Sequence, residues 1–136
     1  MVIRERMIIV ERMINDMLQS LDVTDPDMSR IEMLEEELYE MKTVVSWLNN
    51  EWNAKKNTYV EDGVQYVKLI NWTPFNFRFV RLHLEMIWPN GKNDSMIAET
   101  GEWPARSERK VCFEKLFPEG TVLKADGLMV EFEIER

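Results

Sequence analysis

The sequence predicts an α+β protein in which N-terminal helices form a coiled coil, followed by a small antiparallel β-sandwich that is immunoglobulin-like or an open barrel. Apolar residues recur at alternating spacings of three and four through the first 55 residues, as in a coiled coil. The composition changes near residue 57, and apolar residues then alternate with polar ones in short runs between turns. With 136 residues, the chain has room for one compact domain and an extension.

The first apolar run predicts a helix over residues 2–21, and the second predicts a helix over residues 26–56. A period of about 3.5 residues keeps one narrow apolar seam facing a partner helix, so we expect this seam to be the interface between two copies. The predicted interface residues are Ile3, Met7, Val10, Ile14, Met17, Leu21, Ile31, Leu34, Leu38, Met41, Val45, Leu48 and Trp52.

A break at residues 22–26 separates the two predicted helices. Asp25 can cap the second helix, and Pro26 fits its first turn. The seam advances by ten residues between Leu21 and Ile31, which an unbroken heptad repeat cannot accommodate. The helices are therefore not one continuous coiled coil.

Charged residues beside the seam favour a parallel homodimer. A g residue of one helix meets the following e residue of the other when the two helices run parallel and in register. The pairs at these positions have opposite charge: Arg6 with Glu11, Arg30 with Glu35, and Glu37 with Lys42. The alternative is an antiparallel helical hairpin within one chain, with its loop at residues 22–25.

The composition divides the chain into residues 1–57, a helical dimerisation segment, and residues 58–136, an antiparallel β-domain. All five Gly, all six Phe and four of the five Pro come after residue 57. Lys55 and Lys56 place positive charge at the negative end of the preceding helix, which marks where it stops.

Alternation within the second half predicts the individual strands. Phe77 and Phe79 share one parity, whereas the apolar residues from Val80 onward take the other, so between Phe79 and Val80 we expect a β-bulge or a corner where the strand crosses between sheets. The predicted strands cover residues 64–71, 75–88, 95–103, 109–116, 121–124 and 127–135.

Charge and composition exclude several kinds of partner and compartment. A net charge of −8 leaves too little basic surface to neutralise phosphates, so we expect no nucleic-acid partner. No stretch approaches the roughly 20 apolar residues of a membrane span, and the first residues do not form a signal peptide, so we expect no membrane partner. The single cysteine cannot form an internal disulfide, which favours the cytoplasm or nucleus.

The reactive side chains argue against catalysis. His83, the single histidine, lies on the polar parity of a predicted strand, where we expect an exposed imidazole. Cys112 is expected to be half-buried, with no histidine spaced to activate it. One His and one Cys are too few for the usual metal sites. We therefore expect no enzyme activity, no cofactor and no metal.

Aromatic and basic residues near the strand ends are candidate contacts to a partner. Trp72 directly follows one predicted strand and Trp103 ends another, and Trp side chains are enriched at recognition hot spots. Arg106 and Arg109 belong to a local basic cluster that suits an acidic peptide. The predicted partner-binding residues are therefore Trp72, Trp103, Arg106 and Arg109.

These observations favour a non-catalytic protein–protein interaction module that serves as a scaffold or adaptor. In this interpretation, a coiled-coil homodimer presents two β-domains to an unidentified protein or peptide partner in a larger assembly. Two alternatives remain open. One is a viral or phage structural or host-interference protein, and the other is a carbohydrate-binding β-sandwich with Trp72 and Trp103 as the sugar platform.

Overall fold

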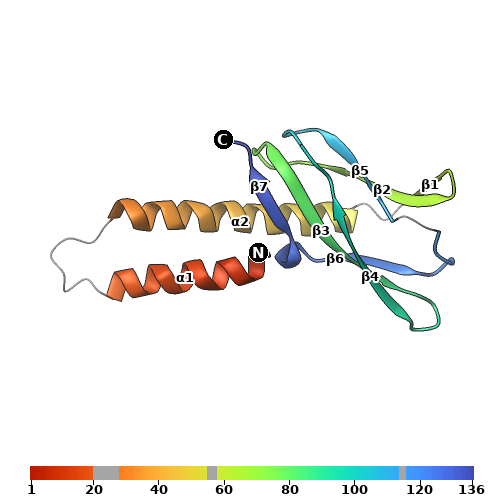
Figure 1. Cartoon of the computed structure of the whole chain (residues 1–136), viewed down its shortest axis with the longest axis horizontal. Helices are drawn as coiled ribbons and strands as arrows, with labels where there is room; N and C mark the ends of the chain where they lie inside the picture. The colour runs from red at the N-terminus through yellow and green to blue at the C-terminus, as the bar shows by residue number, and fades with distance from the viewer. Residues whose placement is uncertain (20–27, 55–57, 114–115) are drawn as a thin grey trace.

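The fold is a helical hairpin followed by two antiparallel β-sheets, which confirms the α+β class (Figure 1). The computed structural model describes residues 1–19, 28–54, 58–113 and 116–136. Helix α1 spans Ile3–Gln19 and helix α2 spans Met28–Ala54. The strands are β1 (Tyr59–Glu61), β2 (Val64–Ile70), β3 (Phe77–Ile87), β4 (Asn93–Glu99), β5 (Glu108–Cys112), β6 (Val122–Ala125) and β7 (Glu131–Ile134), with a 3₁₀ helix, η1 (Gly127–Met129), before β7.

Helices α1 and α2 lie side by side and antiparallel within one chain (Figure 1). The guanidinium of Arg6 donates two hydrogen bonds to the carboxylate of Glu37, at 2.6 and 3.0 Å. This ion pair raises the pKa of Arg6 above its ordinary value, chiefly through the side-chain hydrogen bond. Both residues were assigned to position g, and two g positions face each other when helices run antiparallel. The structure therefore has the alternative hairpin arrangement, whose predicted loop lies outside the described residues.

The seam residues are covered by their own chain. The buried ones are Ile3, Val10, Ile14, Ile31, Leu34, Met41 and Leu48; the half-buried ones are Met7, Met17, Leu38, Val45 and Trp52, while Leu21 lies outside the described residues. Within one chain this set forms an intrachain interface, because a heptad seam serves an antiparallel hairpin as well as a parallel dimer. Parallel pairing of two chains stays a prediction, and it would require the hairpin to open.

The strands form two sheets, one in the order β1-β2-β5 and the other in the order β4-β3-β6, with β7 also pairing with β3. All pairings are antiparallel, as predicted. The register between β3 and β7 shifts between Phe77 and Phe79. The irregularity therefore lies just before the predicted position, which was between Phe79 and Val80. The immunoglobulin-like or open-barrel assignment stays a prediction.

Strands β6 and β7 occupy the two halves of one edge of β3, separated by η1. The sequence predicted one strand over residues 127–135. This prediction is wrong for residues 127–129, which form η1 instead of a strand. Asp126 caps η1 by accepting a hydrogen bond from the Leu128 main-chain N–H (2.9 Å), which turns the chain out of the sheet. At the same place, the Ile3 main-chain N–H donates to the Val130 carbonyl (2.8 Å) and joins the start of α1 to this turn.

The turn at η1 packs directly on helix α2 through Gly127. A Cβ at Gly127 would lie 2.8 Å from the Val45 carbonyl oxygen and 2.9 Å from the Val45 Cα, both main-chain atoms. The Gly127 N–H donates to Oδ1 of Asn49 at 3.0 Å, which fixes the same approach. Only glycine permits this contact without displacing the helix from the sheet edge.

The variant Gly127→Ala is expected to destabilise the protein by about 1–3 kcal/mol, the usual cost of forcing a methyl group into packed surroundings. The added methyl must push the main chain of η1 away from Val45. Urea denaturation followed by far-UV circular dichroism measures the change, with a lower midpoint expected at an unchanged slope. An unchanged midpoint would contradict this close packing.

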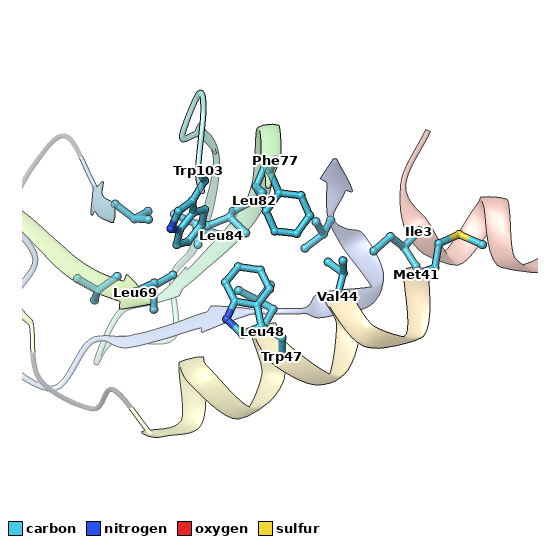
Figure 2. Close-up of a cluster of buried hydrophobic side chains, with 14 of the residues drawn as sticks. Ile3, Met41, Val44, Trp47, Leu48, Leu69, Phe77, Leu82, Leu84 and Trp103 are labelled. Carbon is cyan, nitrogen blue, oxygen red and sulfur yellow. The ribbon is translucent and has the colours of Figure 1, made fainter. Parts of the chain in front are cut away.

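The C-terminal half of α2 contributes to the core between the sheets. Figure 2 shows Trp47 and Leu48 pointing from α2 toward Trp103. The rings of Trp47 and Trp103 meet edge to face with centroids 5.2 Å apart, and Trp47 stacks on Phe77 at 6.0 Å. Val44 and Leu48 are fully buried beside them. The described residues on both sides of residue 57 therefore share one hydrophobic core.

Trp52, the last residue of the seam, packs on the β-strands. Its Nε1–H donates to the Leu123 carbonyl at 3.2 Å, and its ring lies edge to face with Phe113 at 6.4 Å. The last turns of α2 are thus held by β6 and by the residue that follows β5.

Candidate functional site

The structure separates the four predicted partner-binding residues. Trp103 has no exposed surface, so it cannot contact a partner, and this part of the prediction is corrected. Its main chain pairs with Phe77 through two hydrogen bonds of 2.9 and 3.0 Å, and its Nε1–H donates to the Ser107 carbonyl at 2.9 Å. Trp103 is a core residue because this bridge draws it between the sheets.

Trp72 and Arg106 lie together on the surface. The side chain of Trp72 is 52% exposed, and the Arg106 guanidinium lies over its ring at 5.5 Å from the centroid. The guanidinium of Arg109 instead donates to the main-chain carbonyls of Glu102 (2.9 Å) and Glu108 (2.8 Å). The predicted site is therefore reduced to Trp72 and Arg106.

A buried carboxylate on α2 holds the indole of Trp72. Glu51 is 5% exposed and accepts hydrogen bonds from Trp72 Nε1–H (3.0 Å) and from the Ile70 main-chain N–H (3.2 Å). Trp47, one turn earlier on α2, donates to the Ile70 carbonyl at 2.7 Å. Helix α2 thus bonds to both the N–H and the carbonyl of Ile70 at the end of β2. Through Glu51 it also fixes the indole of Trp72.

The loop that carries Trp72 is built around Asn71, which is fully buried. The Asn71 amide donates to the carbonyls of Phe75 (2.9 Å) and Trp103 (3.2 Å), and its oxygen accepts from the main chain and hydroxyl of Thr73. The Asn71 carbonyl also accepts the N–H of Arg106 (2.7 Å), a residue with a positive φ of 67°. Asn71 therefore positions both residues: its side-chain amide orders the loop that carries Trp72, and its main-chain carbonyl holds Arg106.

Between this loop and α2 lies a hollow of about 650 Å³, which we call the Trp72 groove. Its walls are formed by α2 on one side and by the loop on the other. The side chains that matter for recognition are Tyr39, Lys42, Ser46 and Asn50 from α2, and Trp72 and Pro74 from the loop. Tyr39 is 63% exposed, so the groove has an exposed aromatic side chain on each wall.

The sequence predicted Trp72 and Arg106 but missed the residues that α2 contributes. Glu51 and Tyr39 lie off the apolar seam, where a charged or aromatic residue is ordinary on an exposed helix face. The available signal was Trp47 together with Val44, two apolar residues that lie off the predicted seam. It indicated that a second face of α2 is covered.

The basic cluster near residue 109 is partly neutralised within its sheet. Lys110 of β5 forms an ion pair with Glu61 of β1, with Nζ 2.5 Å from the carboxylate. Their hydrogen bond raises the pKa of Lys110 and lowers that of Glu61. Cys112 on the same strand is exposed, whereas the sequence predicted it to be half-buried. The exposed position follows from alternation along an edge strand, because the neighbours of Cys112, Val111 and Phe113, are the buried residues.

A larger hollow of about 1120 Å³ lies beside Trp52, between the end of α2 and strands β3, β4 and β6. His83 contributes to its wall. The imidazole is half-buried, and its Nε2 is shielded from solvent with no hydrogen-bond partner among the described residues, so the expectation of an exposed imidazole was wrong. Polar parity alone did not predict this burial.

No protein-family model matches the chain, and neither a curated protein nor a solved structure shows significant similarity to it. Within the four described ranges, no group of three or more His, Cys, Asp or Glu side chains is placed to hold a metal ion. Neither helix, over its described length, is long and apolar enough to cross a bilayer. The functional argument therefore starts from the geometry of the Trp72 groove.

Proposed function

We propose that this chain is a non-catalytic protein–protein interaction module that binds a protein or peptide partner of a larger assembly through the Trp72 groove. The observation that supports the proposal is a half-exposed Trp72 fixed by Glu51 beneath it and Arg106 over its ring. A tryptophan that is already ordered loses little conformational entropy on binding, which is what makes such residues binding hot spots.

The charges around the groove favour an apolar segment flanked by carboxylates. Lys42 lies in the groove wall and Arg106 lies over Trp72, whereas the carboxylate of Glu51 is buried and accepts two hydrogen bonds. In a chain of net charge −8, this places positive side chains where a partner would approach. Opposite charge at the rim of an interface accelerates association and selects among partners.

The hydrogen bonding of Trp72 weighs against a proline-rich partner. Grooves that bind proline-rich segments use exposed aromatic side chains. The Nε1–H of Trp72 is not free to donate to such a segment, because it is already bonded to Glu51. The carbohydrate-binding alternative loses one of its two aromatic platforms, because Trp103 is buried. An acidic, partly apolar peptide uses the groove most completely.

Selection from a displayed random-peptide library tests this function. We expect enrichment of peptides that combine an aromatic or aliphatic residue with Asp or Glu. The variant Trp72→Ala is expected to weaken their binding about thirtyfold, which corresponds to a hot-spot loss of about 2 kcal/mol. Isothermal titration calorimetry with an enriched peptide measures the loss.

The matched control is Tyr59→Ala, because Tyr59 is an aromatic residue of β1 with 46% exposure outside the groove. This variant is expected to bind the enriched peptides with unchanged affinity. Peptides that bind Trp72→Ala as tightly as the unchanged protein would place the binding surface elsewhere.

A further inference from the structure

Residues 104–107 form a tight turn with an arginine at a position that usually carries glycine. The Ser107 N–H donates to the Pro104 carbonyl at 3.2 Å and closes the turn, and the third residue, Arg106, has a φ of 67°. Turns with a positive φ at the third residue normally have glycine or asparagine there, because a Cβ crowds the backbone in the left-handed region. Arginine at this position therefore strains the main chain.

One other described residue besides glycine has a positive φ, and its turn explains it. Asp62 (φ 52°) and Gly63 (φ 74°) form the connection between β1 and β2. Asp-Gly is a preferred pair for a two-residue hairpin turn, in which both residues need a positive φ. Arginine has no comparable preference for the left-handed region, so the strain at Arg106 indicates a role for its side chain.

Hydrogen bonds to the main chain hold Arg106 in this conformation. Its N–H donates to the Asn71 carbonyl at 2.7 Å, and the N–H of the preceding residue, Ala105, donates to Oδ1 of Asn76 at 2.9 Å. Neither bond uses the side chain of residue 106. The backbone should therefore keep this conformation in variants at position 106.

The guanidinium of Arg106 is available to a partner. It lies over the exposed Trp72 ring, 5.5 Å from the centroid, and it forms no ion pair or side-chain hydrogen bond with any described residue. The guanidinium groups of Arg6, Arg81 and Arg136, in contrast, are each paired with a glutamate. An arginine stacked on an aromatic ring uses its face for that contact and leaves the N–H groups of its edge to donate.

A carboxylate is the group that fits this arrangement. The planar fork of a guanidinium binds a carboxylate through two parallel hydrogen bonds, a geometry that lysine cannot provide. Sites for phosphorylated segments use clusters of arginine, whereas the described walls of the Trp72 groove add one further cation, Lys42. The carboxylate of Glu51 does not compete for Arg106, because it is buried and accepts hydrogen bonds from Trp72 and Ile70.

We propose that Arg106 determines which partners the Trp72 groove accepts. Its guanidinium, placed over Trp72 by the strained turn, donates two parallel hydrogen bonds to one Asp or Glu carboxylate of the bound segment. The proposal rests on the function proposed for this groove, and it names the residue that recognises the acidic part of the partner. The strain is retained because arginine at this position contributes to binding and not to folding.

Paired peptides test the selectivity. A peptide enriched in the library selection is synthesised in its original form and with each Asp or Glu replaced by Asn or Gln, which keeps its shape and removes the charge. Isothermal titration calorimetry is expected to show the acidic form binding the unchanged protein about tenfold more tightly. In Arg106→Ala the two forms should bind within about twofold of each other, and Arg106→Lys should keep only part of the preference, because an ammonium group lacks the planar fork. The matched control is Arg4→Ala, which removes the same charge from an exposed position on α1 and should keep the tenfold preference.

The variant Arg106→Gly tests the strain. It removes the same guanidinium as Arg106→Ala, so it should lose the same preference for the acidic peptide. Its urea midpoint should be higher than that of Arg106→Ala, because glycine adopts a positive φ without strain. The control is Ala105→Gly at the preceding residue, whose φ is not positive, and there the added glycine should lower the midpoint.

The two measurements separate this proposal from the function of the groove. If Arg106→Ala keeps the preference for the acidic peptide while Trp72→Ala weakens binding, the groove would stand and the role of Arg106 would be overturned. A midpoint for Arg106→Gly no higher than that of Arg106→Ala would contradict the strained turn and overturn the proposal on that ground. Peptides that bind independently of Trp72, or a selection that enriches none, would contradict the groove itself and the role of Arg106 with it.

Discussion

Replacing Leu48 with Asp is expected to unfold the strands together with the helices. Leu48 has no exposed surface and lies among the buried residues that α2 shares with both sheets. An unpaired carboxylate in an apolar interior costs several kcal/mol, which is comparable with the total stability of a small domain, about 5–15 kcal/mol. Far-UV circular dichroism should show the loss of helix and strand signals in a single step.

The control for this experiment is Met33→Asp on the same helix. Met33 is 69% exposed, so the same change in charge and size should leave the unfolding midpoint nearly unchanged. If Leu48→Asp melts the helices but leaves a folded β-domain, residues 58–136 would have a core of their own. The shared core described above would then be contradicted.

Replacing Trp103 with Ala is expected to lower the free energy of unfolding by about 3–5 kcal/mol, the usual cost of deleting a buried aromatic side chain. The ring packs edge to face on Trp47, and its Nε1–H satisfies the Ser107 carbonyl. The substitution therefore removes both a large apolar contact and a hydrogen bond. Differential scanning calorimetry measures the fall in the melting temperature.

Trp72→Ala provides the comparison. Both tryptophans lie at the ends of predicted strands, but only Trp103 is buried. Deleting the exposed indole of Trp72 removes its hydrogen bond to the buried carboxylate of Glu51 and should cost about 1.5–3 kcal/mol. Equal losses of stability for the two variants would mean that Trp103 is not the core residue described here. The smaller loss also keeps Trp72→Ala folded for peptide-binding measurements.

The periodicity of the first 55 residues predicted both helices and the stripe that each buries, but it did not determine what covers that stripe. Arg6 and Glu37 suit a parallel dimer when each is matched within its own run, and they suit a hairpin when matched with each other. The heptad pattern is identical in the two cases. Contacts that periodicity does not encode favour the hairpin in the structure, namely the ion pair between Arg6 and Glu37 and the docking of Ile3 on Val130.

Strands β2 to β7 were predicted near their observed places because alternation is a local property, whereas the three-residue strand β1 was not among the predicted strands. The departures arise from contacts between distant residues. Trp103 is drawn into the core by a bridge to Phe77, and Gly127 leaves the sheet because it fits against Val45 of α2. Neither partner is near in sequence, so the local pattern could not reveal these contacts.

The candidate site was predictable where it depends on exposed aromatic and basic residues of one loop region. Trp72 and Arg106 were identified this way. Glu51 was not, because its role depends on α2 lying against the end of β2. When a helix and a loop together form a site, the sequence pattern of either segment alone does not predict the contacts between them.

The hydrogen bond between Ile3 and Val130 has a consequence for biosynthesis. The first helix leaves the ribosome long before the segment against which its beginning docks. Contacts between residues so far apart in sequence slow folding, since the intervening chain must be ordered before they form. During translation, the start of α1 therefore stays undocked until the chain around Val130 has emerged from the ribosome.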